Sequence, residues 1–355
     1  MEQVLYAYND GYFRMNSNRV LNQNSMNRKF ILIIGGIILS LLQGCSQGSD
    51  IQQEEKSFVE LNGQLSVQGN RMVNQHGEVT ALHGVSFGWH NWWPRFYNKG
   101  TVRWLATDWN CTVVRAAIGV EPDGAFLDNP EQAYNLLYRV IDAAIADGIY
   151  VIVDWHSHTI LTEDAKDFFA TVATKYKDYP NILYEIFNEP EYDSWEDVKA
   201  YSEEIIKTIR GIDLKNMILV GSPHWSQDIH LAADDPITGY DNIMYTVHFY
   251  SATHKQYLRD RVEYALNKGI PVFVSECAAT EASGSGSFDM EEWDRWVQLM
   301  DKHRLSYVMW SVADKDELCS MVKDTTSPAS HWTENDLKIW GVTVRELLRS
   351  KAKKI

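Results

Sequence analysis

The sequence predicts a (β/α)8 barrel, and three observations support this fold class. Short apolar, β-branched runs recur eight times between residues 80 and 310, at intervals of about 26 to 37 residues, which suit one strand, loop and helix each. Longer segments with apolar residues at helical spacing separate these runs. Polar or aromatic residues follow each run, at the end of the strands where such barrels form their active sites. The number of units alone is also compatible with an open, doubly wound sheet.

The predicted strands are nearly continuous in apolar residues, which is typical of a parallel sheet covered by helices. They are 80–85, 112–116, 149–154, 182–187, 217–220, 243–247, 271–275 and 306–310. The clearest predicted helices are 131–147, 164–177, 195–210, 256–267 and 290–303. Ahead of the first strand, residues 62–80 alternate polar and apolar around two glycine turns, which predicts a β-hairpin that closes the bottom of the barrel.

The N-terminal segment has the pattern of an export signal. Residues 30–42 are a continuous apolar run after Arg28 and Lys29, and the run is shorter than the roughly 20 residues that span a bilayer. A basic start followed by such a run predicts a signal peptide. The next residues, Leu42-Gln43-Gly44-Cys45, resemble a bacterial lipoprotein cleavage box, which implies a lipid on Cys45, although Gln43 departs from the usual small residue.

These patterns divide the chain into three parts. Residues 1–45 are an upstream extension with the signal peptide, 46–58 are a polar, flexible tether, and 59–355 are the barrel, whose size suits one catalytic domain. We expect a secreted protein or a cell-surface lipoprotein of a bacterium, in contact with a membrane only through Cys45. Ordinary secretion with an unmodified Cys45 is the alternative. We expect a monomer.

Composition excludes several classes of partner. The chain has 33 basic and 48 acidic residues, a net charge of −15, which disfavours nucleic acid because its binding needs basic patches. A neutral polymer is compatible with this charge, and 13 Trp and 18 Tyr suit stacking on sugars. No glycine-rich phosphate loop precedes a helix, so we expect no cofactor.

The cysteines and histidines do not form a metal-binding pattern. Cys45, Cys111, Cys277 and Cys319 lie at scattered spacing without a CxxC pair, which makes a zinc site unexpected. A site built from His156, His158 and His248 is an alternative that the proposed chemistry does not need. A disulfide between Cys277 and Cys319 stays open.

Two glutamates are the candidate catalytic pair. Glu189 and Glu276 follow the fourth and seventh predicted strands, which face each other across a barrel mouth. Cleavage of a glycosidic bond needs an acid for the leaving oxygen and a carboxylate at the sugar carbon. The apolar strands before each glutamate should desolvate it, so that one could hold a proton while the other stays charged. A single glutamate after a strand is more often an exposed carboxylate on a loop. Two glutamates on opposite sides of the barrel mouth make the catalytic interpretation the better one.

Four further residues are expected around this pair. Arg115 should keep Glu276 ionised, and Tyr250 should donate a hydrogen bond to it; a structural ion pair is the alternative for Arg115. His156 should contact a sugar hydroxyl or the carboxylates. His248 should lie close to Glu189.

Six stretches together resemble glycoside hydrolase family 5, in its bacterial endoglucanase branch. They are 108–122, 142–158, 181–190, 224–254, 269–276 and 309–317. The resemblance implies a retaining double displacement on cellulose-type or mixed-linkage β-1,4-glucan, with Glu189 as acid/base and Glu276 as nucleophile.

The resemblance also implies the residues that hold the sugar. Asn188 would bind the 2-hydroxyl. Trp92, Trp225 and Trp310 would be sugar platforms, and Lys315 and Glu317 would hold the glucose two sites to the non-reducing side of the cut. The loop that carries Trp92 matches the family only loosely, and Cys277-Ala278 departs from the residues that usually follow the nucleophile.

Other interpretations of the same pattern remain. A β-mannanase, a mixed-linkage glucanase or a xyloglucanase could share the fold, because glucose and mannose differ only at the 2-hydroxyl. A non-catalytic glycan-binding lipoprotein would keep the tryptophans but has no need of both glutamates. Among glucans we expect soluble or amorphous chains to be preferred.

Overall fold

The computed structural model describes residues 56–352 of the chain. The predicted extension and signal peptide, Cys45, and residues 46–55 of the predicted tether lie outside the described residues. Within 56–352, no helix combines the length and the apolarity that crossing a membrane requires.

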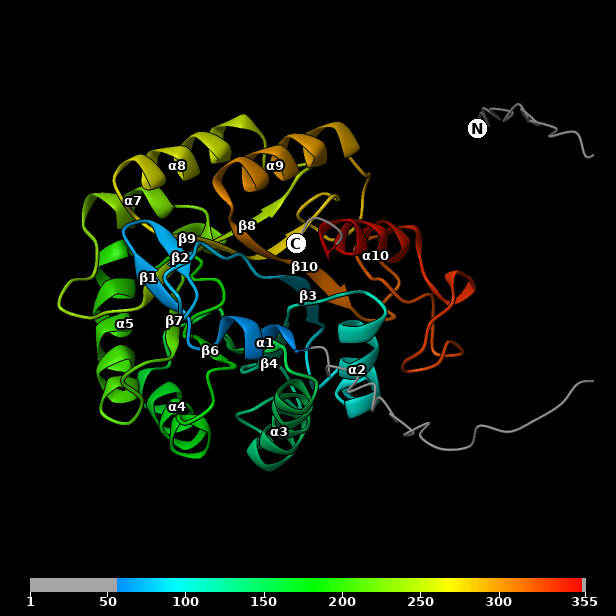
Figure 1. Ribbon diagram of the computed structural model, residues 1–355, viewed down its shortest axis with the longest axis horizontal. Helices are drawn as coiled ribbons and strands as arrows, with labels where there is room; N and C mark the ends of the chain where they lie inside the picture. Colours follow the sequence, from blue (N-terminus) through cyan, green and yellow to red (C-terminus); the bar gives the residue numbers. More distant parts are fainter. Residues whose placement is uncertain (1–55, 353–355) are drawn as a thin grey trace, which may run out of the picture. The chain divides into compact units, whose positions relative to one another are not determined.

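Eight parallel strands form a closed barrel, which confirms the predicted fold class and rules out the open sheet (Figure 1). Each strand pairs with the next along the chain, and the last pairs with the first. The strands are β3 (His83–Phe87), β4 (Val113–Gly119), β5 (Tyr150–His156), β6 (Ile182–Glu185), β7 (Met217–Val220), β8 (Ile243–Tyr250), β9 (Val272–Ala278) and β10 (Ser306–Val312).

Helices surround the barrel and cover the outward side chains of its strands (Figure 1). They are α2 (Lys99–Thr107), α3 (Pro130–Ala146), α4 (Thr162–Tyr176), α5 (Trp195–Arg210), α6 (Pro223–Ser226), α7 (Ile229–Asp234), α8 (Gln256–Asn267), α9 (Met290–His303) and α10 (Ile339–Ala352), with 3-10 turns η1 (Pro94–Phe96) and η2 (Glu334–Asp336). The predicted bounds of α5, α8 and α9 are confirmed, and those of α3 and α4 differ by one or two residues.

Local sequence explains why the predicted helices were recognisable. In α5, the Ser194 side chain caps the helix by accepting from the Asp197 amide, and basic residues occupy the last turn. Its Val198, Ile205 and Ile209 share one buried face. Helices α2, α6, α7 and α10 were not predicted from the sequence.

An N-terminal hairpin closes one end of the barrel, as predicted. Strands β1 (Ser66–Gln68) and β2 (Arg71–Val73) pair antiparallel. Leu65 and Met72 of this hairpin belong to one buried cluster with Val113 and Tyr150, at the start of barrel strands. Apolar burial therefore joins the hairpin to the N-terminal end of the barrel.

The predicted tether was too long at its C-terminal end. Helix α1 (Phe58–Asn62) begins there, and the Ser57 side chain accepts from the Glu60 amide while the Glu60 carboxylate accepts from the Ser57 amide. This reciprocal capping box orders residues that had been assigned to the tether.

Inward-facing side chains change from apolar to polar along the strands. Because strand side chains alternate with a period of two, residues two positions apart point to the same side. Val113 is followed inward by Arg115, Ile152 by Asp154, and Leu183 by Glu185. The barrel interior thus has an apolar layer near the hairpin and a charged layer near the opposite end.

Most of the strands that carry candidate residues extend further than predicted. Strands β4, β5, β8, β9 and β10 continue two or three residues past their predicted ends, because their polar side chains pair inside the barrel and do not mark a loop. Strand β6 ends two residues earlier than predicted, and Glu189 lies on the loop that follows it. Cys111, Cys277 and Cys319 are buried and free, so the disulfide left open above is not formed.

We predict that the hairpin contact stabilises the barrel. Leu65→Ala removes a side chain that is only 1% exposed, and such truncations reduce the free energy of unfolding by about 2–5 kcal/mol. Leu61→Ala is the matched control, because Leu61 lies nearby but is 51% exposed, and its effect should stay within about 0.5 kcal/mol. Urea unfolding followed by tryptophan fluorescence measures both. Equal stability of the two variants would contradict the proposed contact.

Candidate active site

A hollow of about 340 Å³ lies at the C-terminal ends of the barrel strands. Its lining includes both candidate glutamates, with Tyr250, His156, Trp310, Lys315, Glu317, Trp92, Trp89, Trp93, His158 and Cys319. Most of the residues predicted as a site therefore meet in one place.

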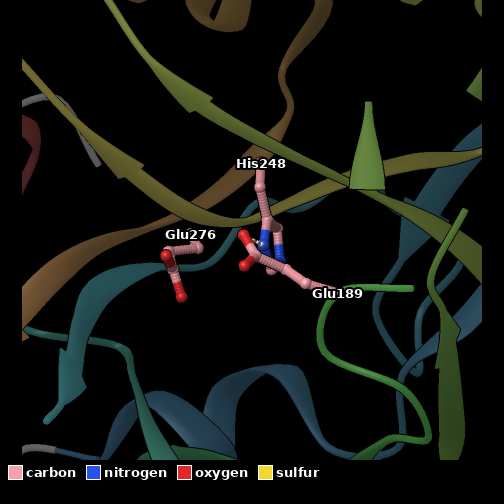
Figure 2. Close-up of side chains that lie close together, drawn as sticks. All are labelled: Glu189, His248 and Glu276. Atoms are coloured by element: carbon pink, nitrogen blue, oxygen red, sulfur yellow. Dashed lines mark hydrogen bonds and ion pairs between the residues drawn. The ribbon is translucent and has the colours of Figure 1, made fainter. Parts of the chain in front are cut away.

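Figure 2 shows Glu189 beside the His248 ring and Glu276 on the other side of that ring. Glu276 belongs to β9, where it is in register with His248 of β8, and Glu189 is on the β6–α5 loop. One oxygen from each glutamate and one ring nitrogen of His248 lie within 4.8 Å of one another. Retaining glycosidases place their carboxyl groups about 5–5.5 Å apart, whereas inverting ones need about 6.5–9.5 Å to fit a water molecule. The spacing matches the retaining geometry.

Two donors hold the Glu276 carboxylate. Arg115 Nη1 donates to Oε2 at 3.1 Å, and the Tyr250 hydroxyl donates to Oε1 at 2.7 Å. Both contacts were expected from the sequence. Each carboxylate oxygen thus accepts one hydrogen bond, and together the two bonds fix the orientation of the carboxylate.

Arg115 is completely buried among acceptors. Its guanidinium contacts Glu185 Oε2 at 2.6 Å, Asp154 Oδ2 at 3.0 Å and Asn188 Oδ1 at 2.7 Å, in addition to Glu276. The Asn188 side-chain nitrogen is buried and has no hydrogen-bond partner among the described residues. That free donor is compatible with the sugar hydroxyl contact that the resemblance implies.

His248 links Glu189 to the interior of the barrel. Its Nδ1 lies 2.9 Å from Glu189 Oε1, and its Nε2 lies 2.9 Å from Ser275 Oγ and 3.5 Å from Glu185 Oε1. Burial alone would lower the pKa of His248, but the contacts with Glu185 and Glu189 outweigh it and raise the pKa to about 10. His248 is therefore an imidazolium at neutral pH, and both ring nitrogens donate.

The two glutamates have opposite pKa shifts in the empty site. Burial, followed by the charge of Glu189, raises the pKa of Glu276 despite Arg115 and Tyr250. For Glu189, burial acts to raise the pKa, but the His248 imidazolium outweighs it and the pKa is lowered. This order is the reverse of what an acid role for Glu189 requires before substrate binds.

His156 supports the floor of the hollow. Its Nδ1 lies 2.7 Å from Asp154 Oδ2, and its ring stacks on Trp310 at 5.4 Å between centroids and 5° between planes. Burial, reinforced by the charge of Arg115, puts the pKa of His156 well below its usual value. The ring is neutral and holds the Trp310 face in place.

The predicted sugar-binding residues divide into two groups. Trp92, half exposed and stacked on Trp89 at 4.8 Å, lines the hollow with Lys315 and Glu317, which form an ion pair of 2.5 Å. Trp225 does not line it. Its ring packs against Tyr192 at 5.7 Å, next to the loop that carries Glu189.

Known proteins are similar to this chain over most of its length. The family model for cellulases of glycosyl hydrolase family 5 matches residues 73–316. The chain belongs to glycoside hydrolase family 5. An endoglucanase of Clostridium saccharobutylicum is 37% identical over 306 residues, which is 84% of this chain and 68% of that protein. Endoglucanase Z of Dickeya dadantii is 41% identical over 71% of this chain and 60% of its own.

Solved structures of family 5 are similar across the barrel. A protein from Cytophaga hutchinsonii is 46% identical with a TM-score of 0.82, covering 84% of this chain and 98% of that one. The catalytic domain of Thermobifida fusca endoglucanase Cel5A, solved with cellotetraose, is 30% identical with a TM-score of 0.78, covering 82% and 99%. The recognition of the family from sequence motifs is confirmed.

Several residues of this family 5 site were not assigned a role from the sequence. Asp154 and Glu185 are buried carboxylates beside Arg115, and Trp89 packs edge-on against His156 at 4.4 Å. Strand periodicity could have found the carboxylates, because each lies two residues beyond an inward apolar side chain. Trp89 gave no such signal, since its neighbours include three other aromatic residues.

The site does not favour a metal ion. Within residues 56–352, the only cluster with suitable spacing is Glu189, His248 and Glu276. His248 and Glu189 are already paired as an imidazolium and a carboxylate, and the Arg115 cation contacts Glu276. The alternative trio of His156, His158 and His248 does not form a cluster there.

We predict that His254 makes the fold sensitive to acid. Its Nδ1 accepts a hydrogen bond from the Tyr250 amide at 2.9 Å, and burial lowers its pKa to about 4. An unfolded histidine titrates near about 6.5, so below that pH the unfolded chain binds a proton that the folded chain does not. Stability should therefore fall between about pH 6.5 and 4, by up to roughly 3 kcal/mol from this group.

The measurement is urea unfolding at a series of pH values for the wild type and His254→Gln. The pKa values of other histidines, such as His83 and His90, are lowered as well, so the difference between the two proteins isolates His254. The control is His76→Gln at an exposed site, which should retain the wild-type profile. Parallel profiles for the wild type and His254→Gln would overturn the prediction.

Proposed function

We propose that this family 5 glycoside hydrolase is a retaining endo-β-1,4-glucanase, with Glu189 as acid/base and Glu276 as nucleophile. The observation that carries the proposal is a pair of carboxylates with one oxygen of each within 4.8 Å of the other. Arg115 and Tyr250 hold one of them, and His248 holds the other. A separation this short is typical of retaining enzymes, in which the second carboxylate itself attacks the sugar carbon.

In the first step, Glu276 attacks the anomeric carbon while Glu189 protonates the leaving oxygen. Arg115 and Tyr250 orient the attacking carboxylate. Substrate that enters the hollow displaces water from Glu189, and this further desolvation raises its pKa toward that of a proton donor. The Asn188 side-chain nitrogen, which has no hydrogen-bond partner among the described residues, is proposed to donate to the sugar hydroxyl next to the reacting carbon.

In the second step, water hydrolyses the glycosyl ester. Glu189, now ionised, removes a proton from that water, and Glu276 is released as a carboxylate. The ester has no negative charge, so during this step Glu189 no longer faces an anionic Glu276. The His248 imidazolium stabilises the ionised form of Glu189, which suits a base.

The substrate is proposed to be a β-glucan chain. The relatives named endoglucanase support glucan over mannan, and Trp92, Trp310 and the Lys315–Glu317 pair line one hollow with the carboxylates. Apolar sugar faces stack on indole rings, and the ion pair offers both donors and acceptors to hydroxyls. Trp225 is proposed as a platform on the leaving-group side, beside the Glu189 loop.

Export of the chain is part of the proposal. The basic and apolar pattern of residues 28–42 supports secretion, and the sequence around Cys45 supports a lipid anchor at the bacterial cell surface. Mass spectrometry of the mature protein tests both, since it reports the first residue and any lipid mass on Cys45.

We predict that either glutamate is indispensable. Glu189→Gln and Glu276→Ala should each lower kcat on carboxymethylcellulose by about 10²–10⁴-fold, because they remove the proton donor and the attacking carboxylate. Glu191→Gln is the matched control, since Glu191 lies on the same loop and is more exposed. Reducing-sugar release measures all three. Retained activity of Glu276→Ala on any glucan would exclude it as the nucleophile.

Azide distinguishes the two roles. With an activated aryl cellobioside, Glu189→Ala should form the β-glycosyl azide, because azide replaces water in attack on the ester, whereas Glu276→Ala should form the α-glycosyl azide by direct attack. Proton NMR identifies the anomers. The reverse pattern would exchange the two assignments.

We predict strong activity of the wild type on carboxymethylcellulose and barley β-glucan and weak activity on mannan. Activity on mannan alone would keep the mechanism and change the substrate. No activity on any of them, with intact folding, would favour a glycan-binding protein.

A further inference from the structure

Glu185 occupies a position behind both candidate catalytic carboxylates. It is the last residue of β6 and is completely buried. Its Oε2 accepts from Arg115 Nε at 2.6 Å, and its Oε1 lies 3.5 Å from His248 Nε2. Arg115 also donates to Glu276, and His248 also contacts Glu189. A single carboxylate therefore lies between the two cations that hold the catalytic pair.

We propose that Glu185 is a positioning residue that ties Arg115 to His248, keeps His248 as an imidazolium that donates to Glu189, and so sets the acid/base group relative to the nucleophile. The inference rests on the roles proposed above for Glu189 and Glu276. It adds a third carboxylate that does not touch substrate but controls both of those that do.

A role confined to neutralising Arg115 does not explain the position of Glu185. Arg115 already contacts Glu276 and Asp154 through its terminal nitrogens. The second oxygen of Glu185 has no hydrogen-bond partner among the described residues, and it faces His248. A buried oxygen without such a partner is costly unless a nearby charge stabilises it, and the imidazolium is that charge.

Few charged groups other than Glu185 face His248 and could stabilise its protonated form. The anions that face it are Glu185 on β6, Glu189 on the following loop and Glu276 on β9. The nearby His156 on β5 and His254 after β8 have lowered pKa values and are neutral. Burial acts to raise the pKa of Glu185, but Arg115 and His248 lower it to about 2, so Glu185 stays charged throughout the working range.

Asp154 provides a matched control. It is equally buried and also contacts Arg115, but its other close partner is His156 and not His248. Asp154→Asn therefore changes a carboxylate that contacts Arg115 and His156, whereas Glu185→Gln changes, at similar volume, the one whose Oε1 lies 3.5 Å from His248 Nε2.

The first experiment is an NMR titration of the His248 imidazole in the whole protein, assigned by loss of its signal in His248→Gln. In the wild type, His248 should stay protonated to above about pH 8. Glu185→Gln should lower the titration midpoint by more than about one pH unit, and Asp154→Asn by less than about half a unit. The titration needs no substrate, so its outcome is independent of whether the chain hydrolyses glucan.

The second experiment uses two aryl cellobiosides with wild type, Glu185→Gln and Glu185→Asp. Phenol is a poor leaving group that needs the acid, whereas 2,4-dinitrophenol leaves without it. Glu185→Gln should lower kcat for the phenyl substrate at least about tenfold more than for the dinitrophenyl one, with KM changed less than about twofold. Glu185→Asp keeps the charge and should recover part of the loss.

Two results would overturn the proposal. One is a titration midpoint of His248 near pH 7 in the wild type. This result can be obtained even if Glu185→Gln fails to fold. The other is a folded Glu185→Gln protein with an unchanged His248 midpoint and equal losses on both substrates, which would describe a structural ion pair only.

Discussion

The buried guanidinium of Arg115 is the interaction on which the site depends. An unpaired cation at this depth would be very costly, and the barrel compensates with carboxylates from three other strands, Asp154, Glu185 and Glu276. These acceptors can reach one point only because the strands are closed into a cylinder and their inward side chains lie in layers. Glu276 belongs to this network directly, and the proposed catalytic pair is therefore linked to the charges that compensate Arg115.

That network also explains how two similar glutamates can serve different tasks. Glu276 is inside a strand and accepts from Arg115 and Tyr250, which fix the orientation of its carboxylate for the proposed attack. Glu189 is on a loop and contacts the imidazolium of His248. Its lowered pKa in the empty site suits the base step, and the acid step needs the desolvation that a bound sugar supplies. The surroundings of the two glutamates therefore distinguish their proposed roles, although the two side chains are chemically the same.

Much of this could be predicted from the sequence, because the relevant patterns are local. Eight apolar runs predicted the barrel, and helical spacing of apolar residues predicted α5 within its observed bounds. The Asn188-Glu189-Pro190 turn and the segment before Glu276 predicted the pair and its family. The strand ends were less well predicted, since a polar residue that pairs inside a barrel resembles, in sequence, the first residue of a loop.

The sequence by itself determined the fold class, the family and which two carboxylates are candidates. Hydrophobic periodicity and short motifs involve residues that are close together in the chain, so they can be recognised without the structure. Only the tertiary structure decided which side chains meet. Glu185 and His248 are far apart in the chain, and only barrel closure brings Glu185 Oε1 to 3.5 Å from His248 Nε2. The position of Trp225 outside the hollow likewise depends on how distant segments pack. The order of the two glutamate pKa values depends on burial and on charged groups that come from several strands.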